Sequence, residues 1–335
     1  MKALITKDAR LYEVSGNIAK MYAGASGRDL HIDAVLSNLT IGFRPTGMIA
    51  DQVFPVVNVD KETNFYYVWP REEWFRLKNS ERSRGTAAKK INTTVSTDTY
   101  VVKNYALGID VPYEDIGNAD DALELQQSNA NLIKDSLMLN WEDRLAVLLG
   151  NTANHGANNV LAQNYANQAN TDPVADIDAG LETIRSTTGM EANVMIVSMP
   201  SWRRLRRHPN LIEYIRGKGD NVGGGGVTQQ QVANAFEVSK VLIGRGIKNT
   251  AGEGEAGAYS DIWSQNIILM HVAPSPGRMV ATYGYTFQWV PPGFPAAFTV
   301  RRLDDDRNMV ETQELHHFQD EKICSTALGY IIQNA

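Results

Sequence analysis

The chain has 335 residues, of which 43% are hydrophobic and 21% charged, a composition typical of globular rather than disordered or fibrous proteins. Its net charge of −6 and pI of about 5.6 argue against a protein that holds nucleic acid by neutralising phosphates. No stretch approaches the roughly 18 apolar residues of a membrane span, and the single cysteine, Cys324, excludes an intrachain disulfide and a thiolate-rich metal site, so we expect a soluble, unsecreted protein stabilised by packing and association.

The first 105 residues contain two unusual segments. Residues 1–50 show no sustained helical pattern, which indicates an arm laid over another part of the structure. From Val56 to Lys103, two segments rich in Val, Thr, Tyr and Phe flank a charge-crowded middle. Such segments favour strands, but an isolated two-stranded hairpin is at best marginally stable in water. The excursion therefore needs a partner.

Charge is distributed unevenly between this excursion and the tail of the chain. Residues 71–90 hold seven basic and three acidic side chains, whereas residues 301–321 hold three basic and seven acidic ones. These could be two solvated faces or complementary patches on neighbouring subunits, because charge complementarity sets register and orientation between partners. The candidate loop-tip residues are Arg71, Glu72, Glu73, Trp74, Arg76, Lys78, Arg82, Arg84, Lys89 and Lys90, and the candidate acidic partners are Asp304, Asp305, Asp306, Glu311 and Glu314.

One unusually long helix is predicted from Asp120 to Leu149. Asp121 and Glu124 resemble a capping box at its start, and Gly150 stands where a C-terminal cap belongs. About 30 residues would span roughly 45 Å, against about 11 or 12 residues for a usual helix. Such a helix could be a structural spine or a long core helix of an enzyme. Its apolar stripe comprises Ile133, Leu137, Trp141, Leu145 and Leu148.

The rest of the chain predicts a second compact lobe and a return to β structure. Residues 151–173, rich in Asn, Ala and Gln, predict a surface excursion between lobes. A helix over 172–189, a buried strand over 192–200 and a helix over 201–217 should follow, then a glycine loop and a short helix. Strands are expected over 240–250, 261–274, 277–290, 296–303, 308–318 and 323–333, and the glycine loop contains Gly223, Gly224, Gly225 and Gly226.

The sequence offers no credible catalytic or metal-binding motif. The stretch GEGEAG at 252–257 matches GxGxxG formally, but Glu253 and Glu255 would oppose phosphates and no strong helix follows. The histidines lack metal-ligand spacing, and adjacent His316 and His317 on a strand would point to opposite faces. We therefore predict no catalytic residue, no cofactor and no metal.

The densest basic cluster comprises Arg203, Arg204, Arg206 and Arg207. On a helix these side chains spread around the cylinder instead of forming one stripe. Contact with nucleic acid, pairing with acidic groups within or between subunits, and simple solvation remain alternatives.

The order of these parts resembles that of the major capsid proteins of tailed bacteriophages, which have the Hong Kong 97 fold. Segments 49–76, 105–149, 192–215 and 328–335 are similar to the family's loop entry, return strand with spine helix, apical strand with helix, and closing strand. The resemblance implies an α+β subunit with an N-terminal arm (1–50), an extended loop (51–105), a peripheral domain (106–170) with spine helix 120–149, an axial domain (171–295) and a β return (296–335).

The resemblance also implies a function, that of a non-enzymatic head protein of a tailed double-stranded DNA phage. Copies would form the pentamers and hexamers of an icosahedral shell, assembled in the host bacterial cytoplasm and enclosing DNA without sequence-specific binding or contact with a membrane. A separate scaffolding protein, a portal and a decoration protein are candidate partners. An encapsulin-type nanocompartment shell protein is the alternative of related fold, and a soluble enzyme with an oligomerising hairpin is disfavoured by the missing active site.

Overall fold

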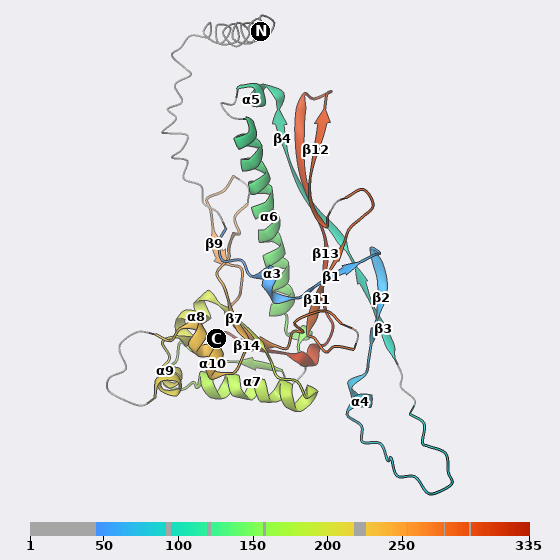
Figure 1. The fold of residues 1–335 in the computed structure, drawn as a ribbon. Coiled ribbons are helices and arrows are strands. Elements are labelled where there is room, and N and C mark those ends of the chain that lie inside the picture. The colour runs from blue at the N-terminus through green and yellow to red at the C-terminus, as the bar shows by residue number, and fades with distance from the viewer. Residues whose placement is uncertain are drawn as a thin grey trace, which may run out of the picture. The chain divides into compact units, whose positions relative to one another are not determined.

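The computed structural model describes residues 45–335, with gaps at 92–94, 119–121, 157–158, 218–225, 253, 278 and 295. These residues belong to one structural unit that begins at Pro45, and Figure 1 traces its elements in chain order. The arm expected over residues 1–50 therefore lies outside the described residues except for residues 45–50. Helices and strands alternate in the mixed manner expected of an α+β protein.

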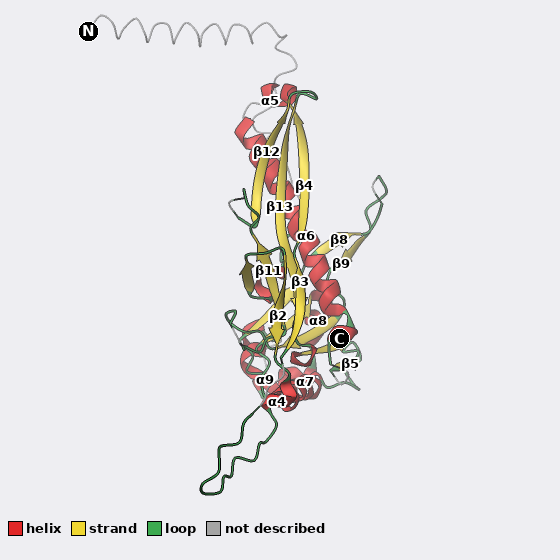
Figure 2. Ribbon diagram, turned by 90° about the vertical axis from the view of Figure 1, so that its right-hand side faces the viewer, coloured by secondary structure: helices red, strands yellow, loops and turns green. Residues whose placement is uncertain are grey.

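The first sheet is built around one long strand, β13 (Val310–Ile323). Along one edge β13 pairs antiparallel with β12 (Phe298–Asp305) and then with β11 (Gly284–Trp289), and along the other with β4 (Lys103–Pro112). Strand β1 (Val56–Val59) joins β11 in parallel. Figure 2 shows β4, β13 and β12 side by side along most of their length. A single strand thus connects most of this sheet.

The second sheet has the order β5 (Val160–Ala162), β14 (Gly329–Gln333), β10 (Asn266–Met270), β6 (Val194–Ser198) and β7 (Lys240–Gly244). All five residues of β6 are buried, as the apolar run at 194–198 predicts for a strand covered on both faces. Helices α7 (Pro173–Thr188), α8 (Met199–Leu205) and α10 (Gln229–Ala235) pack against this sheet, and α9 (Pro209–Arg216) packs against α7.

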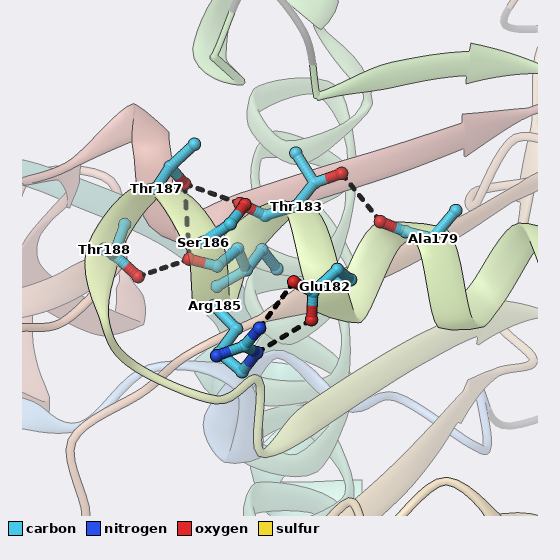
Figure 3. A network of polar contacts seen from close by, with 8 residues as sticks. Ala179, Glu182, Thr183, Arg185, Ser186, Thr187 and Thr188 are labelled. Carbon is cyan, nitrogen blue, oxygen red and sulfur yellow. Dashed lines mark hydrogen bonds and ion pairs between the residues drawn. The ribbon is translucent and has the colours of Figure 1, made fainter.

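Helix α7 illustrates how local sequence sets an element of this second lobe. The Asp172 side chain accepts a hydrogen bond from the N–H of Val174 at 3.1 Å, Pro173 occupies the first turn, and Gly189 ends the helix with a φ of 69°. Along its exposed side the hydroxyls of Thr183 and Thr187 donate to backbone carbonyls four residues earlier, at 2.6 and 2.7 Å (Figure 3). The buried side joins the main core.

The long helix α6 (Ala122–Gly150) has 29 residues and agrees with the predicted spine to within two residues at its start and one at its end. It packs on β13 and β4, where Ile133 and Leu137 meet Leu315. Its last turns enter the core of the second sheet through Leu145 and Leu149. Because one helix belongs to both cores, it links the two sheets. The predicted cap residue Asp121 lies outside the described residues, and Gly150 is the last helical residue rather than the one beyond it.

The excursion after β1 forms the expected hairpin, but its first arm is divided. Strand β2 (Thr63–Val68) pairs antiparallel with β3 (Ser96–Val101), and a short helix α4 (Arg71–Trp74) follows β2. The turn at 60–62 separates β1 from β2, so one predicted strand is two. Smaller elements are α3 (Ala50–Val53), α5 (Tyr113–Asn118), the paired strands β8 (Ile247–Asn249) and β9 (Tyr259–Asp261), and the 3-10 helices η1 (Thr152–Asn154) and η2 (Thr326–Leu328).

Two further expectations from the sequence are wrong. The single helix predicted over 201–217 is two helices. His208 takes an extended conformation, because the residue before a proline disfavours the helical one, and the next helix begins at Pro209. The supposed surface excursion at 151–173 contributes β5 to the second sheet, and it buries His155 and Tyr165. Because its composition is mostly polar, the segment was predicted to be exposed, and the burial of these two rings was not expected.

Candidate assembly interface

The two faces of the β2–β3 hairpin differ in what they contact. On the inner face, the Tyr100 ring stacks on Phe287 with centroids 4.6 Å apart, and the Tyr66 ring lies 5.7 Å from the same phenyl. On the outer face, Phe65 and Tyr67 are 69% and 66% exposed. The alternation follows from the period of two along a strand. The hairpin is therefore anchored on one side and leaves an aromatic surface open on the other.

A network of polar side chains secures the inner face. The Tyr66 hydroxyl donates to Oδ2 of Asp98 at 2.7 Å, and the Lys322 ammonium of β13 lies 3.3 Å from the same oxygen. These bonds hold the pKa of Asp98 below its usual value, with Tyr66 the largest cause. The hairpin is thereby tied to the first sheet.

The predicted tip residues fall into a proximal and a distal group. In the proximal group, Glu73 pairs with Arg76 and Lys78, both at 3.3 Å, and Arg71 lies 4.0 Å from Glu72. Trp74 meets Trp69 edge to face with centroids 6.4 Å apart. The distal group is exposed, and its members have no ion pair with the described residues; it comprises Arg82, Arg84, Lys89 and Lys90.

The predicted acidic partners differ in their surroundings, although Asp304 and Glu311 lie opposite each other in the pairing of β12 with β13. Asp304, Asp305 and Asp306 lie together where β12 turns into β13, and Asp305 accepts from the side chain of Asn308 at 2.7 Å. Glu311 lies 3.6 Å from Arg302, and its side chain is only 13% exposed. It also accepts from Gln126 of α6. Glu314 lies 3.1 Å from His316.

The spine residues lie on the covered side of α6. Ile133, Leu137, Trp141 and Leu145 are buried, and Leu148 is partly buried against the main core. His317 packs edge to face on Trp141, whereas His316 on the opposite face of β13 packs against Phe294, as the strand period predicts.

A buried carboxylate on the spine was missed by the sequence reasoning. Glu142 is 0% exposed; its Oε2 accepts from the backbone N–H groups of Ile49 and Ala50 at 2.9 and 2.7 Å, and its Oε1 accepts from the indole of Trp263. Burial raises the pKa of Glu142, although the three donors oppose this effect. The sequence does contain a signal for this burial. Glu142 lies at helical spacing from two apolar residues, Met138 four residues before it and Leu145 three residues after it.

A second polar contact joins α6 to β13. The Arg144 guanidinium lies 3.2 Å from Glu321 and 3.6 Å from the centroid of the Tyr105 ring. The Glu321 side chain is 8% exposed, and burial raises its pKa while Arg144 opposes the shift. The helix is thus held on the sheet by charge as well as by packing.

A large hollow lies beside the base of the hairpin. It has a volume of about 1060 Å³ and is lined by aromatic residues of 66–75 on one side and by residues of 276–285 and 323–328 on the other. Cys324 lies in its wall, and burial raises the pKa of its thiol to about 11, so little reactive thiolate exists at neutral pH. Among the described residues, no group of three or more His, Cys, Asp or Glu side chains could hold a metal ion.

The arginine cluster lies on α8 and the turn that follows it. Arg204 donates to Oε1 of Gln265 at 2.8 Å and to the carbonyl of Ala335 at 3.0 Å. Arg203, Arg206 and Arg207 are exposed, and within the described ranges none of the four forms an ion pair with an acidic side chain. Of the predicted axial loop, Gly226 lies beside Arg206, and Gly223, Gly224 and Gly225 lie outside the described residues. None of the helices in the described ranges combines the length and the apolar character that crossing a bilayer requires.

Comparison with known proteins gives two curated relatives, both named major capsid protein. That of Burkholderia phage BcepMu is 27% identical over 266 residues, which cover 77% of this chain and 83% of the relative. That of Pseudomonas phage JBD67 is 22% identical over 263 residues, which again cover 77% of this chain and 83% of the relative. No family model matches the chain.

Solved structures are similar over nearly the whole chain. A phage-related protein from Bordetella bronchiseptica RB50 matches with a TM-score of 0.66 and 22% identity, over 90% of this chain and 97% of its own. The capsid of cyanophage P-SCSP1u matches with a TM-score of 0.58 and 9% identity, over 92% and 94%. The encapsulin of Synechococcus elongatus PCC 7942 matches with a TM-score of 0.56 and 11% identity, over 90% and 95%.

Proposed function

We infer that this chain, which has the Hong Kong 97-type capsid fold, is the major capsid protein of a tailed double-stranded DNA bacteriophage. The fold expected from the sequence is confirmed by the solved capsid structures. The observation that carries the function is the similarity to two phage major capsid proteins over 77% of the chain. Its role is structural, as theirs is, and its place is in the virion.

We further propose the division of the subunit that the resemblance implies. Residues 1–50 are the arm, 51–105 the extended loop, 106–170 the peripheral domain with its spine, 171–295 the axial domain and 296–335 the β return. The two sheets support a peripheral and an axial part, because the first contains β4, β12 and β13 and the second contains β6, β7 and β10. Two strands cross the proposed bounds: β5 lies in the second sheet and β11 in the first. Helix α6, which enters both cores, is the spine.

The exposed surface of the hairpin supports self-association. Its outer aromatic face and its loop 76–91 are exposed in the single chain, and exposed apolar patches mark interaction sites. We propose that copies form pentamers and hexamers, with a separate scaffolding protein, a portal and a decoration protein as candidate partners, and that they assemble in the bacterial cytoplasm. The net charge of −6 suits enclosure of DNA without sequence-specific binding.

The encapsulin alternative has less support. One encapsulin matches the fold at 11% identity, which speaks to fold alone, whereas both curated relatives are phage proteins. Shell contents separate the two, because an encapsulin encloses protein cargo and a phage head encloses a genome.

Electron microscopy of the purified recombinant chain tests the function. We expect closed shells or capsomers, from the chain alone or after co-expression with a candidate scaffolding protein. In particles from infected cells, this chain should form the shell around DNA. Discrete monomers under every condition would contradict a shell function, and shells filled with one enzyme would favour the encapsulin alternative.

A further inference from the structure

The first sheet ends in a group of acidic side chains from two distant segments. Glu114 and Asp115 belong to α5, and Asp304–Asp306 lie where β12 turns into β13. The N–H of Tyr113 donates to the carbonyl of Met309 at 3.0 Å, which joins the start of α5 to this turn. We call these five carboxylates the acidic end.

The charge of the acidic end is poorly compensated by nearby residues. Arg307 is the one basic side chain among residues 113–118 and 303–310, all of which the structure describes. Beside this group, Arg302 of β12 lies 3.6 Å from Glu311, which stands opposite Asp304, so this further pair adds no net charge. Four of the five acidic residues are exposed, and Asp305, the fifth, is half-buried and bonded to its own turn. Like charges held together this way repel each other and favour a cationic partner.

The chain carries a matching cationic surface. We call Arg82, Arg84, Lys89 and Lys90 the basic loop; Glu81 is the one acidic side chain among residues 79–91. The proximal residues Arg76 and Lys78 already pair with Glu73, so the distal four are the ones open to a partner. Leu77 and Ile91 border this loop and are 99% and 64% exposed, which adds apolar surface to it.

The two surfaces do not meet within one chain. In the pairing of β4 with β13, Lys103 lies opposite Gln319 near the hairpin, and Pro112 lies opposite Val310 at the acidic end. Those ten residues of β4 span roughly 30 Å at about 3.3 Å per residue. Figures 1 and 2 both show the loop after α4 leading away from the β12–β13 turn.

We propose that, in the shell inferred above, the basic loop of one copy docks on the acidic end of a second copy. This inference rests on the proposed function and names the surface that the loop recognises. A second copy supplies both charges, so the contact repeats from subunit to subunit without another protein. DNA could neutralise the basic loop but would be repelled by the acidic end. Complementary charge also excludes loop-to-loop contacts and so fixes orientation.

Charge reversal on each surface tests the pairing. The first variant carries Arg82→Glu and Arg84→Glu, the second carries Asp304→Lys and Asp306→Lys, and the third carries all four changes. Each reversal alone should reduce shell yield about tenfold at moderate salt, and the fourfold variant should regain most of it, because the pair is restored with opposite sign. The charge-retaining Arg82→Lys/Arg84→Lys variant should assemble normally. Circular dichroism of each subunit checks that these exposed positions leave the fold intact.

Carbodiimide crosslinking gives a second readout. It joins lysines to carboxylates in contact, so oligomers mixed from isotopically light and heavy chains should yield heavy-light links between Lys89 or Lys90 and Asp304 or Asp306. Wild-type shells without these links, normal assembly of both reversals, or a fourfold variant that regains nothing would each overturn the docking while leaving the shell function intact. A wild-type chain that forms no oligomer under any condition would overturn both.

Discussion

The indole Nε1 of Trp263 donates a hydrogen bond to Oε1 of Glu142 at 2.5 Å, although the two residues are 121 positions apart in the chain. The other carboxylate oxygen binds the N–H groups of Ile49 and Ala50 at the start of α3. One side chain of α6 therefore fixes both the start of α3 and the segment before β10. Three polar donors depend on one buried carboxylate.

Replacing Glu142 with Ala should destabilise the subunit strongly. It leaves three buried donors without an acceptor, and each such group costs about 1–3 kcal/mol. Glu142→Gln retains one acceptor oxygen but turns an amide toward a donor, so its loss should be intermediate. Urea unfolding of the unassembled subunit measures both, with Asp143→Asn as the control, since Asp143 and its partner Lys248 are more exposed. Equal stabilities of wild type and Glu142→Ala would contradict this role.

Breaking the pair between Arg144 and Glu321 should cost more than breaking a surface pair. Glu321→Gln leaves a partly buried guanidinium without its carboxylate, and losses of about 3–5 kcal/mol are typical of buried pairs. Replacing both residues with Met should recover much of the loss. The exposed pair of Glu182 and Arg185 (Figure 3), 2.6 Å apart, is the control, because Glu182→Gln should cost under about 1 kcal/mol. A similar cost at both pairs would show that burial is not decisive here.

Acid should destabilise the subunit in part through His317. Burial, with a contribution from Arg144, lowers the pKa of His317 to about 4 from an ordinary 6.5. Above pH 6.5 both folded and unfolded states hold a neutral ring, so this group adds no pH dependence there. Between pH 6.5 and 4 the unfolded chain binds a proton that the folded chain does not, so stability falls as pH falls.

Replacing His317 with Phe isolates that contribution. Phe fits between the aromatic rings of Trp141 and Phe298 but cannot be protonated. His155 and His208, whose pKa values are also lowered by burial, keep their own share of the slope. We expect the wild type to lose more stability than the variant as the pH is lowered from 7 to 4. A constant difference would contradict the prediction.

Gly180 in α7 should resist substitution by Ala. A Cβ there would lie 2.8 Å from Cδ1 of Leu269 and from Cδ1 of Tyr330, closer than packed atoms allow. Helix propensity alone favours Ala by about 1 kcal/mol, but overpacking costs about 1–3 kcal/mol. Whether Gly180→Ala raises or lowers the unfolding temperature decides which of these two effects is larger, and thermal unfolding measures it. Gly117 in α5 has no atom within 4 Å of such a Cβ, so Gly117→Ala should stabilise instead.

Removing the loop should separate folding from assembly. Residues 76–90 are exposed and lie outside the described cores, so a short Gly-Ser linker in their place should leave the far-ultraviolet circular dichroism and thermal unfolding unchanged. Closed shells should not form, because the proposed contact with a second copy is lost. Shells of normal appearance in electron micrographs would rule out an assembly role for the loop.

Elements stabilised by nearby residues were predictable from the sequence. The stripe from Ile133 to Leu145 repeats at helical spacing over several turns, so α6 was placed almost to its ends. The apolar run of β6 and the capped helix α7 were similarly clear.

Distant contacts were not predictable. Nothing near Glu142 reveals that Trp263 is its partner, and Glu311, assigned to an exposed acidic patch, is bound by Arg302 and Gln126. Telling a bound acidic side chain from an exposed one requires knowing which strands are neighbours. That order depends on pairing between strands roughly 200 positions apart in the chain, as in the contact of Asp110 with Thr312.

The positions of β13 and β14 in the sequence determine when the two sheets can be completed during synthesis. Strand β13 pairs with β4, β11 and β12, and β14 lies between β5 and β10. The first sheet therefore lacks an inner strand until residue 323 has left the ribosome, and the second until residue 333 has done so. The hairpin emerges some 200 residues earlier, before the sheets that support it exist. Non-local pairing of this kind is slow and leaves strand edges exposed meanwhile. Translation itself therefore delays the moment at which a nascent chain becomes able to join its neighbours.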